Sequence, residues 1–462
     1  MMDMKADVQP SAELAAFAAG LAYDDLPVST REFARNWFVD SIASALASDL
    51  SDETRRYARF ARAAGGAGEA SVFGTNDRLS LIGASLINAY QITAVTICDT
   101  YVPAHVHIGP GIIPPALAIA ERDGVDGRTF LTAIAAGAEV AVRVAAGIDY
   151  EVAGPMGWHF PGIVGPFGAA AAVGRLRALT PLQMRNAFGL AGSQAAGTWA
   201  SWGTPTVKFH QSRGAVSGLL AGLLAEEDFT SSSEILTHPD GGMLAAYSDG
   251  GRPDAILDGI AERYELERIS LRLWPGGTPL QPTLTAVFDL ITAARPDFSE
   301  IEEVRVSVAQ SVYDDHVRFA APKGTFELLL SFPFTVASAL RDGRFWLDSI
   351  GPERAADPEL NQFMKQRVEL VADAGLTREQ SALDVRMKDG RTLGARADAA
   401  KGTPGNPASL DDVRDKYARC AAGRYSDADA GELLDLLTRI DELESLERVL
   451  ELLRAAGPRP GG

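Results

Sequence analysis

The stretch Gly168-Ala-Ala-Ala-Ala-Val-Gly174 is the strongest indication of the fold, because almost every side chain in it is small. Side chains of this size let the axes of neighbouring helices approach closely. The longest apolar run, Phe130–Val144, is also rich in Ala and Gly and contains Glu139, which is typical of a buried helix and not of a membrane span. These stretches predict a tightly packed bundle with several fully buried helices.

Apolar residues spaced three and four apart predict further helices on both sides of that stretch. They are expected at 12–21, 30–47, 52–64, 79–94, 130–146, 166–179, 181–195 and 214–225. Thr180-Pro181 is a typical helix start, since the threonine hydroxyl can cap the first turn and proline is well tolerated there.

The pattern changes near residue 269. Val304, Val306 and Val308 alternate with other residues, which predicts a half-buried strand. Further strands are expected at 367–372, 383–387 and 392–395, and helices at 283–294 and 332–340. We therefore expect a mainly α protein with a smaller α/β (α+β) domain. The expected parts are a helical bundle domain at 1–268, a smaller α/β domain at 269–400, and C-terminal helices at 401–462 that return to the bundle.

The formal net charge of −18 at pH 7, from 61 acidic and 43 basic side chains, argues against two classes of partner. A protein with this excess of negative charge repels nucleic acid and anionic membranes, so neither is expected as a partner. The two cysteines, Cys98 and Cys420, do not form a disulfide framework or a zinc ribbon pattern. The first residues lack the basic and apolar regions of a signal peptide, so the expected location is the cytoplasm.

Four of the six histidines lie in three polar islands within the apolar helical sequence. The first island is Cys98–Gly111 with His105 and His107, the second is Gly157–Gly162 with His159, and the third is Gly203–Arg213 with Lys208 and His210. Each island combines histidine with Gly or Pro, which bend the backbone, as sites built from loops often do.

These residue types suit proton transfer next to a carboxylate. An imidazole with a pKa near neutrality can take or give a Cα proton, and Lys208 could hold a carboxylate and stabilise an enolate-like charge. Asp99 could orient an imidazole, and Thr100 could donate a hydrogen bond to the substrate. None of these roles requires a cofactor. The sequence has no GxxxxGK[ST] phosphate loop and no strand–GxGxxG–helix unit that we find convincing, so nucleotide-dependent chemistry is not expected.

Structural roles compete with these functional ones. His159 stands between Trp158 and Phe160 and could be a hydrogen-bonded core histidine, and Lys208 alone could be a solvated surface lysine. His105 and His107 could bind a metal, but no cysteine cluster or paired carboxylates stand nearby, so we expect no metal. Three such islands on a strongly acidic chain favour a site for a small anionic substrate.

The three islands, in this order, resemble the MmgE/PrpD family, which includes 2-methylcitrate dehydratase, cis-aconitate decarboxylase and iminodisuccinate epimerase. Cys98-Asp-Thr100 with His107-Ile108 is similar to the family's Asp-Asp-Thr and His-Pro segment. Gly157-Trp-His159 resembles its Gly-Phe/Trp-His segment, and Lys208-Phe-His210 resembles its Lys-x-x-His helix start. The resemblance runs from about residue 12 to 455.

The resemblance implies an all-helical domain, a smaller lid domain, a homodimer, and an active site in the cleft between the domains, free of metal and organic cofactor. It implies that His107 and His159 are acid/base candidates, and we predict catalytic roles for these two and for Lys208. The residues that we expect to bind the substrate are Asp99, Thr100, His105, His210, Arg272 and Gln281.

Several residues depart from the family pattern on the lid. Arg272 replaces a lysine, which keeps the charge but changes the donor geometry, and Gln281 replaces a histidine, which removes a titratable group. Gly276-Gly277 replaces a pair that contains cysteine, and Phe334 stands where tyrosine is common. The lid side of the site is therefore expected to be altered, which counts against 2-methylcitrate itself as the substrate.

Three hypotheses follow. The first is a cofactor-free lyase or isomerase for a small di- or tricarboxylate, ranked as a 2-methylcitrate dehydratase-type hydro-lyase, then a cis-aconitate decarboxylase, then an epimerase. The second is a non-catalytic relative that binds a carboxylate ligand. The third is a related enzyme for a less polar substrate, which Phe334 and Gly276-Gly277 would suit.

Overall fold

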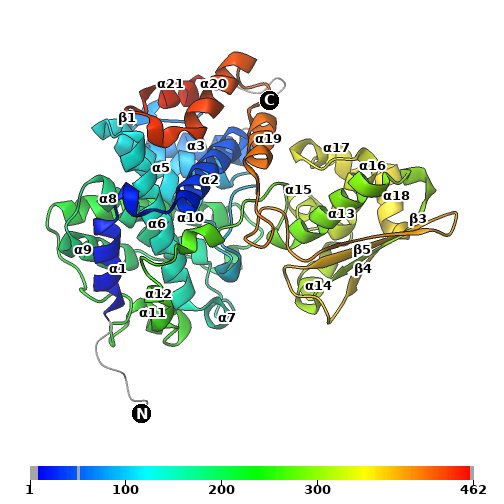
Figure 1. Cartoon of the computed structure of the whole chain (residues 1–462), viewed down its shortest axis with the longest axis horizontal. Coiled ribbons are helices and arrows are strands. Elements are labelled where there is room, and N and C mark those ends of the chain that lie inside the picture. Colours follow the sequence, from blue (N-terminus) through cyan, green and yellow to red (C-terminus); the bar gives the residue numbers. More distant parts are fainter. Residues whose placement is uncertain (1–8, 49–51, 458–462) are drawn as a thin grey trace, which may run out of the picture. The chain divides into compact units, whose positions relative to one another are not determined.

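The computed structural model of the protein describes residues 9–48 and 52–457. Residues 1–8, on which the expectation about a signal peptide rests, lie outside these ranges. The chain forms two compact units: the larger runs to Ile269 and resumes at Val413, and the smaller is Ser270–Asp412. The architecture is mainly helical with a smaller α/β part, as predicted (Figure 1).

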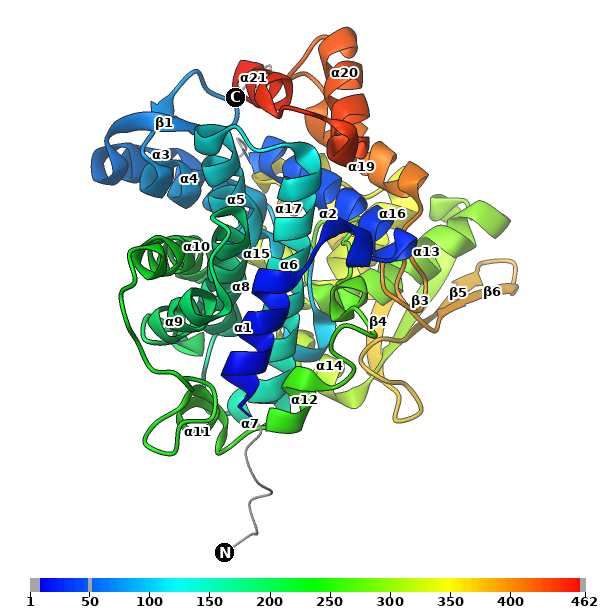
Figure 2. The ribbon, with the colours of Figure 1, turned by 60° about the vertical axis from the view of Figure 1, so that its left-hand side comes forward.

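The larger unit is built from helices joined by loops (Figures 1 and 2). Its helices are α1 (Pro10–Gly20), α2 (Val28–Leu46), α3 (Asp52–Gly65), α4 (Leu81–Thr93), α5 (Gly109–Asp123), α6 (Gly127–Ile148), α7 (Tyr150–Ala153), α8 (Phe160–Leu176), α9 (Pro181–Gly192), α10 (Thr206–Glu226), α11 (Met243–Ser248), α12 (Pro253–Leu257), α19 (Leu410–Ala421), α20 (Asp427–Thr438) and α21 (Glu447–Ala455). Helix α9 begins as predicted, because the Thr180 hydroxyl accepts the Gln183 N–H at 3.3 Å.

The prediction of an all-helical domain needs one correction. Strands β1 (Ala67–Ser71) and β2 (Arg78–Leu79) form an antiparallel pair between α3 and α4. Their short, Ala- and Gly-containing sequence shows no alternation that would have predicted them. A distant contact holds this pair in place, since the Ser71 N–H and hydroxyl both donate to Glu121 at 2.6 Å.

Small residues bring the central helices together as expected. Helix α8 packs against α6, α10 and α5. A Cβ atom on Gly137 of α6 would lie 2.7 Å from the carbonyl oxygen of Gly168 on α8, and one on Gly168 would lie 2.9 Å from that of Gly137. A residue larger than glycine would therefore clash with the facing helix at either position. In the stretch of the chain that the structure describes, α6 alone is long and apolar enough to cross a membrane, but 94% of its apolar window is buried inside the unit.

The C-terminal helices return to the bundle. Figures 1 and 2 show α20 and α21 beside the N-terminal part of the same unit, where α20 contacts α2 and α21 contacts β1. Arg35 of α2 pairs with Asp441 at 3.0 Å. Deeper in the unit, the Lys416 ammonium of α19 donates to Asp40 of α2 at 2.5 Å, and both side chains are fully buried.

The smaller unit contains a four-stranded sheet covered by helices (Figure 1). Its strands are β3 (Ile301–Val308), β4 (Val368–Ala372), β5 (Ser381–Met387) and β6 (Thr392–Ala397), and its helices are α13 (Gln281–Ala294), α14 (Gln310–His316), α15 (Thr325–Leu328), α16 (Phe332–Asp342), α17 (Pro352–Ala355) and α18 (Pro358–Arg367). The strand order is β4-β3-β5-β6, with β3 parallel to β4 and antiparallel to β5. Val304, Val306 and Val308 are buried, as their alternation predicted.

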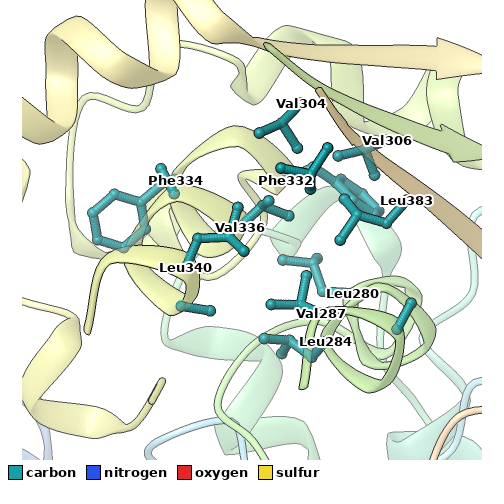
Figure 3. Packing of buried hydrophobic residues seen from close by; sticks show 14 of the residues in the cluster. Leu280, Leu284, Val287, Val304, Val306, Phe332, Phe334, Val336, Leu340 and Leu383 are labelled. Atoms are coloured by element: carbon teal, nitrogen blue, oxygen red, sulfur yellow. The ribbon is translucent and has the colours of Figure 1, made fainter. Parts of the chain in front are cut away.

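The core of the smaller unit lies between these strands and helices α13 and α16 (Figure 3). Phe334 belongs to this buried cluster and is 1% exposed. Gly276 has a positive φ of 127°, and the Gly277 N–H donates to the Leu329 carbonyl at 2.8 Å. The interpretation of Phe334 as a change to a substrate-facing surface is therefore wrong, while the corresponding interpretation of the glycine pair stays a prediction. These residues shape the unit's own core and a turn.

The smaller unit continues past the predicted boundary at residue 400. The Lys401 N–H donates to the Thr285 hydroxyl at 3.0 Å, and the Leu271 N–H donates to the Gly402 carbonyl at 2.8 Å. These bonds tie the turn-rich segment after β6 to the beginning of the same unit. The segment therefore belongs to the smaller unit as far as Asp412.

Candidate active site

The three polar islands converge in the larger unit. The Lys208 ammonium near the start of α10 donates to the Ala94 carbonyl at 2.6 Å, just ahead of the first island. His210 of the same helix meets His159 of the second island, with 3.1 Å between their Nδ1 atoms. His107 of the first island is close enough for its charge to lower the pKa of His159. Segments that are far apart in sequence thus build one site.

Asp99 holds the first island against the beginning of α5. Its carboxylate accepts the Ile108 N–H at 2.8 Å and the Gly109 N–H at 3.1 Å, and the side chain is fully buried. A carboxylate is favourable at a helix N-terminus, although burial raises the pKa of Asp99 to about 7. We infer that Asp99 positions the loop and does not touch the substrate directly.

His107 is held in one orientation by its own loop. Its Nδ1 lies 2.7 Å from the Asp99 carbonyl oxygen and 3.0 Å from the Thr100 hydroxyl. Because a carbonyl oxygen only accepts, Nδ1 must carry the proton, and Nε2 is then the basic nitrogen of the neutral ring. Thr100 is 1% exposed and faces His107, so we infer an orienting role for it in place of direct carboxylate binding.

His105 lies in different surroundings from His107. Its backbone is left-handed, with φ of 51°, and its ring packs on Tyr150 with 4.5 Å between ring centroids. No group of three or more His, Cys, Asp and Glu side chains suited to a metal occurs in the ranges 9–48 and 52–457. The structure therefore gives His105 an aromatic partner and links His107 to the rest of the site.

His159 and His210 form a buried imidazole pair and are 6% and 8% exposed. The loop before α10 supports the pair, since the His159 N–H donates to the Gly197 carbonyl at 3.2 Å. Burial, helped by the nearby His210 and His107, lowers the pKa of His159 from 6.5 to about 3. His159 is therefore a neutral imidazole at physiological pH.

This low pKa predicts a pH-dependent stability. Between pH 6.5 and about 3 the unfolded chain binds a proton at His159 and the folded chain does not. The free energy of unfolding therefore falls as the pH drops through this window. The loss attributable to His159 has an upper limit of about 1.4 kcal/mol per pH unit. The free energy of unfolding of wild type and His159→Gln is measured by urea titration from pH 7 to 4. We expect it to fall less steeply with decreasing pH in the variant. Equal slopes would contradict the assignment.

Lys208 is a largely buried cation. Its side chain is 16% exposed, and Glu53 lies 3.9 Å from its ammonium. Burial lowers its pKa, and the neighbouring Glu53 and Cys98 partly offset this effect. A lysine that is neither solvated nor closely paired with a carboxylate is suited to receive an anionic ligand.

The two remaining predicted site residues belong to the smaller unit. Arg272 is 3% exposed and donates to the Gly276 carbonyl at 3.2 Å. Gln281, at the first position of α13, is also 3% exposed and donates through Nε2 to the Trp274 carbonyl at 3.1 Å. The structure thus gathers His107, His159, Lys208 and His210 in one unit, and it places Arg272 and Gln281 in the other.

Sequence reasoning missed two features around the histidines. Trp199, on the loop before α10, lies with its ring centroid 6.0 Å from that of His159 and stacks on Trp202 at 5.7 Å. Beneath the first island, Lys416 donates to the Ile97 carbonyl at 2.6 Å as well as to Asp40. The aromatic pair in Trp199-Ala-Ser-Trp202 was visible in the sequence. The residues around Lys416 gave no signal that it would contact the segment ahead of the first island.

The fold and these side chains define a two-domain, mainly helical protein with a histidine–lysine site in its larger domain. The chain belongs to the MmgE/PrpD family: residues 12–255 match the MmgE/PrpD N-terminal domain, and residues 274–441 match the MmgE/PrpD C-terminal domain. The resemblance seen in the three islands is therefore confirmed.

Several relatives carry the name cis-aconitate decarboxylase. The Aspergillus terreus protein is 23% identical over 483 residues, which cover 99% of this chain and 98% of that protein. The Mus musculus protein is 25% identical over 83% of this chain and 80% of its own length, and the Homo sapiens protein is 24% identical over 84% and 82%. Family membership and these relatives support an enzyme of the lyase type.

Proposed function

We propose that this protein is a lyase that transfers a proton to a carbon atom next to a carboxylate of a small di- or tricarboxylate, without a metal or organic cofactor. The observation that carries this proposal is the oriented imidazole of His107, fixed through Nδ1 to the Asp99 carbonyl in a site that also holds Lys208. The proposed substrate is anionic, and Lys208 would supply a local positive charge on a chain whose net charge is −18.

Decarboxylation of a cis-aconitate-like substrate is the leading form of this activity. It needs one proton donor at the reacting carbon, whereas dehydration needs a base and an acid, and epimerisation needs two acid/base groups. His107 can serve as that donor, while a His159 with a pKa of about 3 is poorly suited as a second acid or base at neutral pH. The names of the relatives also favour decarboxylation over the hydro-lyase that the sequence analysis ranked first.

The reaction balances without another reactant. The C–C bond to the leaving carboxylate breaks and releases CO2, and its electron pair passes into the alkene conjugated with a remaining carboxylate. The carbon that receives this pair takes the Nε2 proton of the His107 imidazolium, which then regains a proton from solvent. Lys208 would stabilise the negative charge that builds up on the remaining carboxylate.

A substrate panel tests the proposal. We expect purified protein, after exhaustive chelation, to convert cis-aconitate with release of CO2. Proton NMR monitors the loss of substrate and the appearance of product. Conversion of 2-methylcitrate to an alkene would instead identify a hydro-lyase, and conversion of iminodisuccinate would identify an epimerase. If folded protein leaves all three compounds unchanged, the proposed activity on this class is wrong.

A further inference from the structure

The His159–His210 pair has an unusual geometry, because the two rings face each other through the same nitrogen. Their Nδ1 atoms are 3.1 Å apart, and the ring centroids are 5.0 Å apart. His159 immediately precedes α8, and His210 lies near the start of α10. These two helices pack against each other, so the pair is held from both sides by the bundle.

A hydrogen bond between two ring nitrogens requires one N–H donor and one lone pair. Two neutral imidazoles that meet through Nδ1 must therefore be opposite tautomers: one carries its proton on Nδ1 and the other on Nε2. Protonation of either ring is opposed by burial and, at His210, by the Arg213 guanidinium. The contact thus favours two neutral rings with complementary tautomers.

We propose that His210 is a positioning residue that donates its Nδ1–H to Nδ1 of His159 and so holds His159 as the neutral Nε2–H tautomer. His159 then presents a hydrogen-bond donor to a substrate carboxylate. The choice of donor rests on the proposed function, because the opposite tautomer would present a lone pair on Nε2 and repel a carboxylate. The two histidines consequently have different roles. His107 exchanges the proton with the substrate, and His159 binds a substrate carboxylate as a neutral hydrogen-bond donor.

The tautomers can be measured directly by 15N NMR of the whole chain with labelled histidine at pH 7, with resonances assigned through His159→Gln and His210→Asn. We expect His159 to carry its proton on Nε2 and His210 on Nδ1, with a coupling across the Nδ1–Nδ1 hydrogen bond. A proton on Nδ1 of His159, or a charged ring at either position, would overturn the proposal. The spectrum needs no substrate, so its outcome is independent of the substrate panel.

Two variants test the positioning role. In His210→Asn the side-chain amide can donate from nearly the place of Nδ1, so we expect kcat close to that of wild type and an unchanged His159 tautomer. In His210→Leu the donor is lost, so we expect kcat to fall about tenfold and His159 to show a mixture of tautomers. Equal kcat and an unchanged tautomer in His210→Leu would contradict the proposal. If this variant does not fold, the 15N spectrum of the wild type still tests the proposed tautomers of His159 and His210.

Discussion

Replacing His107 with asparagine is expected to lower kcat by about 10²- to 10⁴-fold, the range typical for loss of a general acid or base. The asparagine amide can still donate to the Asp99 carbonyl, which His107 Nδ1 now contacts at 2.7 Å, so the loop should keep its conformation. What is lost is the titratable Nε2. The thermal midpoint should therefore change little while turnover nearly disappears.

The matched control is His238→Asn. His238 lies in the same unit but is exposed, on the loop between α10 and α11, and its Nδ1 accepts only the nearby Asp240 N–H at 3.1 Å among the bonds seen. We expect this variant to keep wild-type kcat. Steady-state kinetics on the substrate that the panel identifies, with thermal unfolding of each variant, provide the measurement. A His107→Asn variant that folds and retains most of its activity would remove His107 from the chemistry.

The Lys416→Met variant is expected to lower the free energy of unfolding of the larger unit by about 3–5 kcal/mol, the usual cost of removing one partner of a buried ion pair. Lys416 and Asp40 are both fully buried, and methionine replaces the ammonium with an apolar end of similar length. The Asp40 carboxylate would remain in the interior without its cation. The Ile97 carbonyl, directly ahead of the first island, would also lose a donor.

A double variant separates charge from packing. Adding Asp40→Asn to Lys416→Met removes the buried charge, so we expect it to recover a large part of the lost stability. Urea titration of wild type, Lys416→Met and the double variant measures the difference in the free energy of unfolding. If Lys416→Met alone costs under about 1 kcal/mol, the pair does not have the buried character that the structure assigns to it.

The helices of the larger unit were predictable because their signals are local. Apolar spacing and small residues marked the central helices, and Thr180-Pro181 marked the start of α9. The β1–β2 pair was not predictable, since its strands are short and depend on Glu121, about 50 residues along the chain. Phe334 was misinterpreted because a change from a family residue does not by itself say whether the position faces a site or a core.

The same limit applies to the site. Histidine, glycine and proline in three islands predicted side chains that the fold brings near one another in the larger unit, because each of these residue types carries a local signal. Whether a side chain meets substrate or supports another residue depends on contacts across the fold. Asp99 and Thr100 were predicted to bind the substrate or, for Asp99, to orient an imidazole, and the structure shows their contacts with the beginning of α5 and the His107 ring. Lys416 and Asp40 are 376 residues apart, so no local pattern could pair them.

The measurement that tests proton transfer by this protein most directly is solvent deuterium incorporation. Wild type and His107→Asn, both chelated, are incubated with cis-aconitate in D2O and followed by proton NMR. We predict that wild type forms a product that carries deuterium at the carbon protonated during CO2 loss, and that His107→Asn does so at least about a hundredfold more slowly. Equal rates for the two proteins, or activity that disappears on chelation and returns with added metal, would contradict the account.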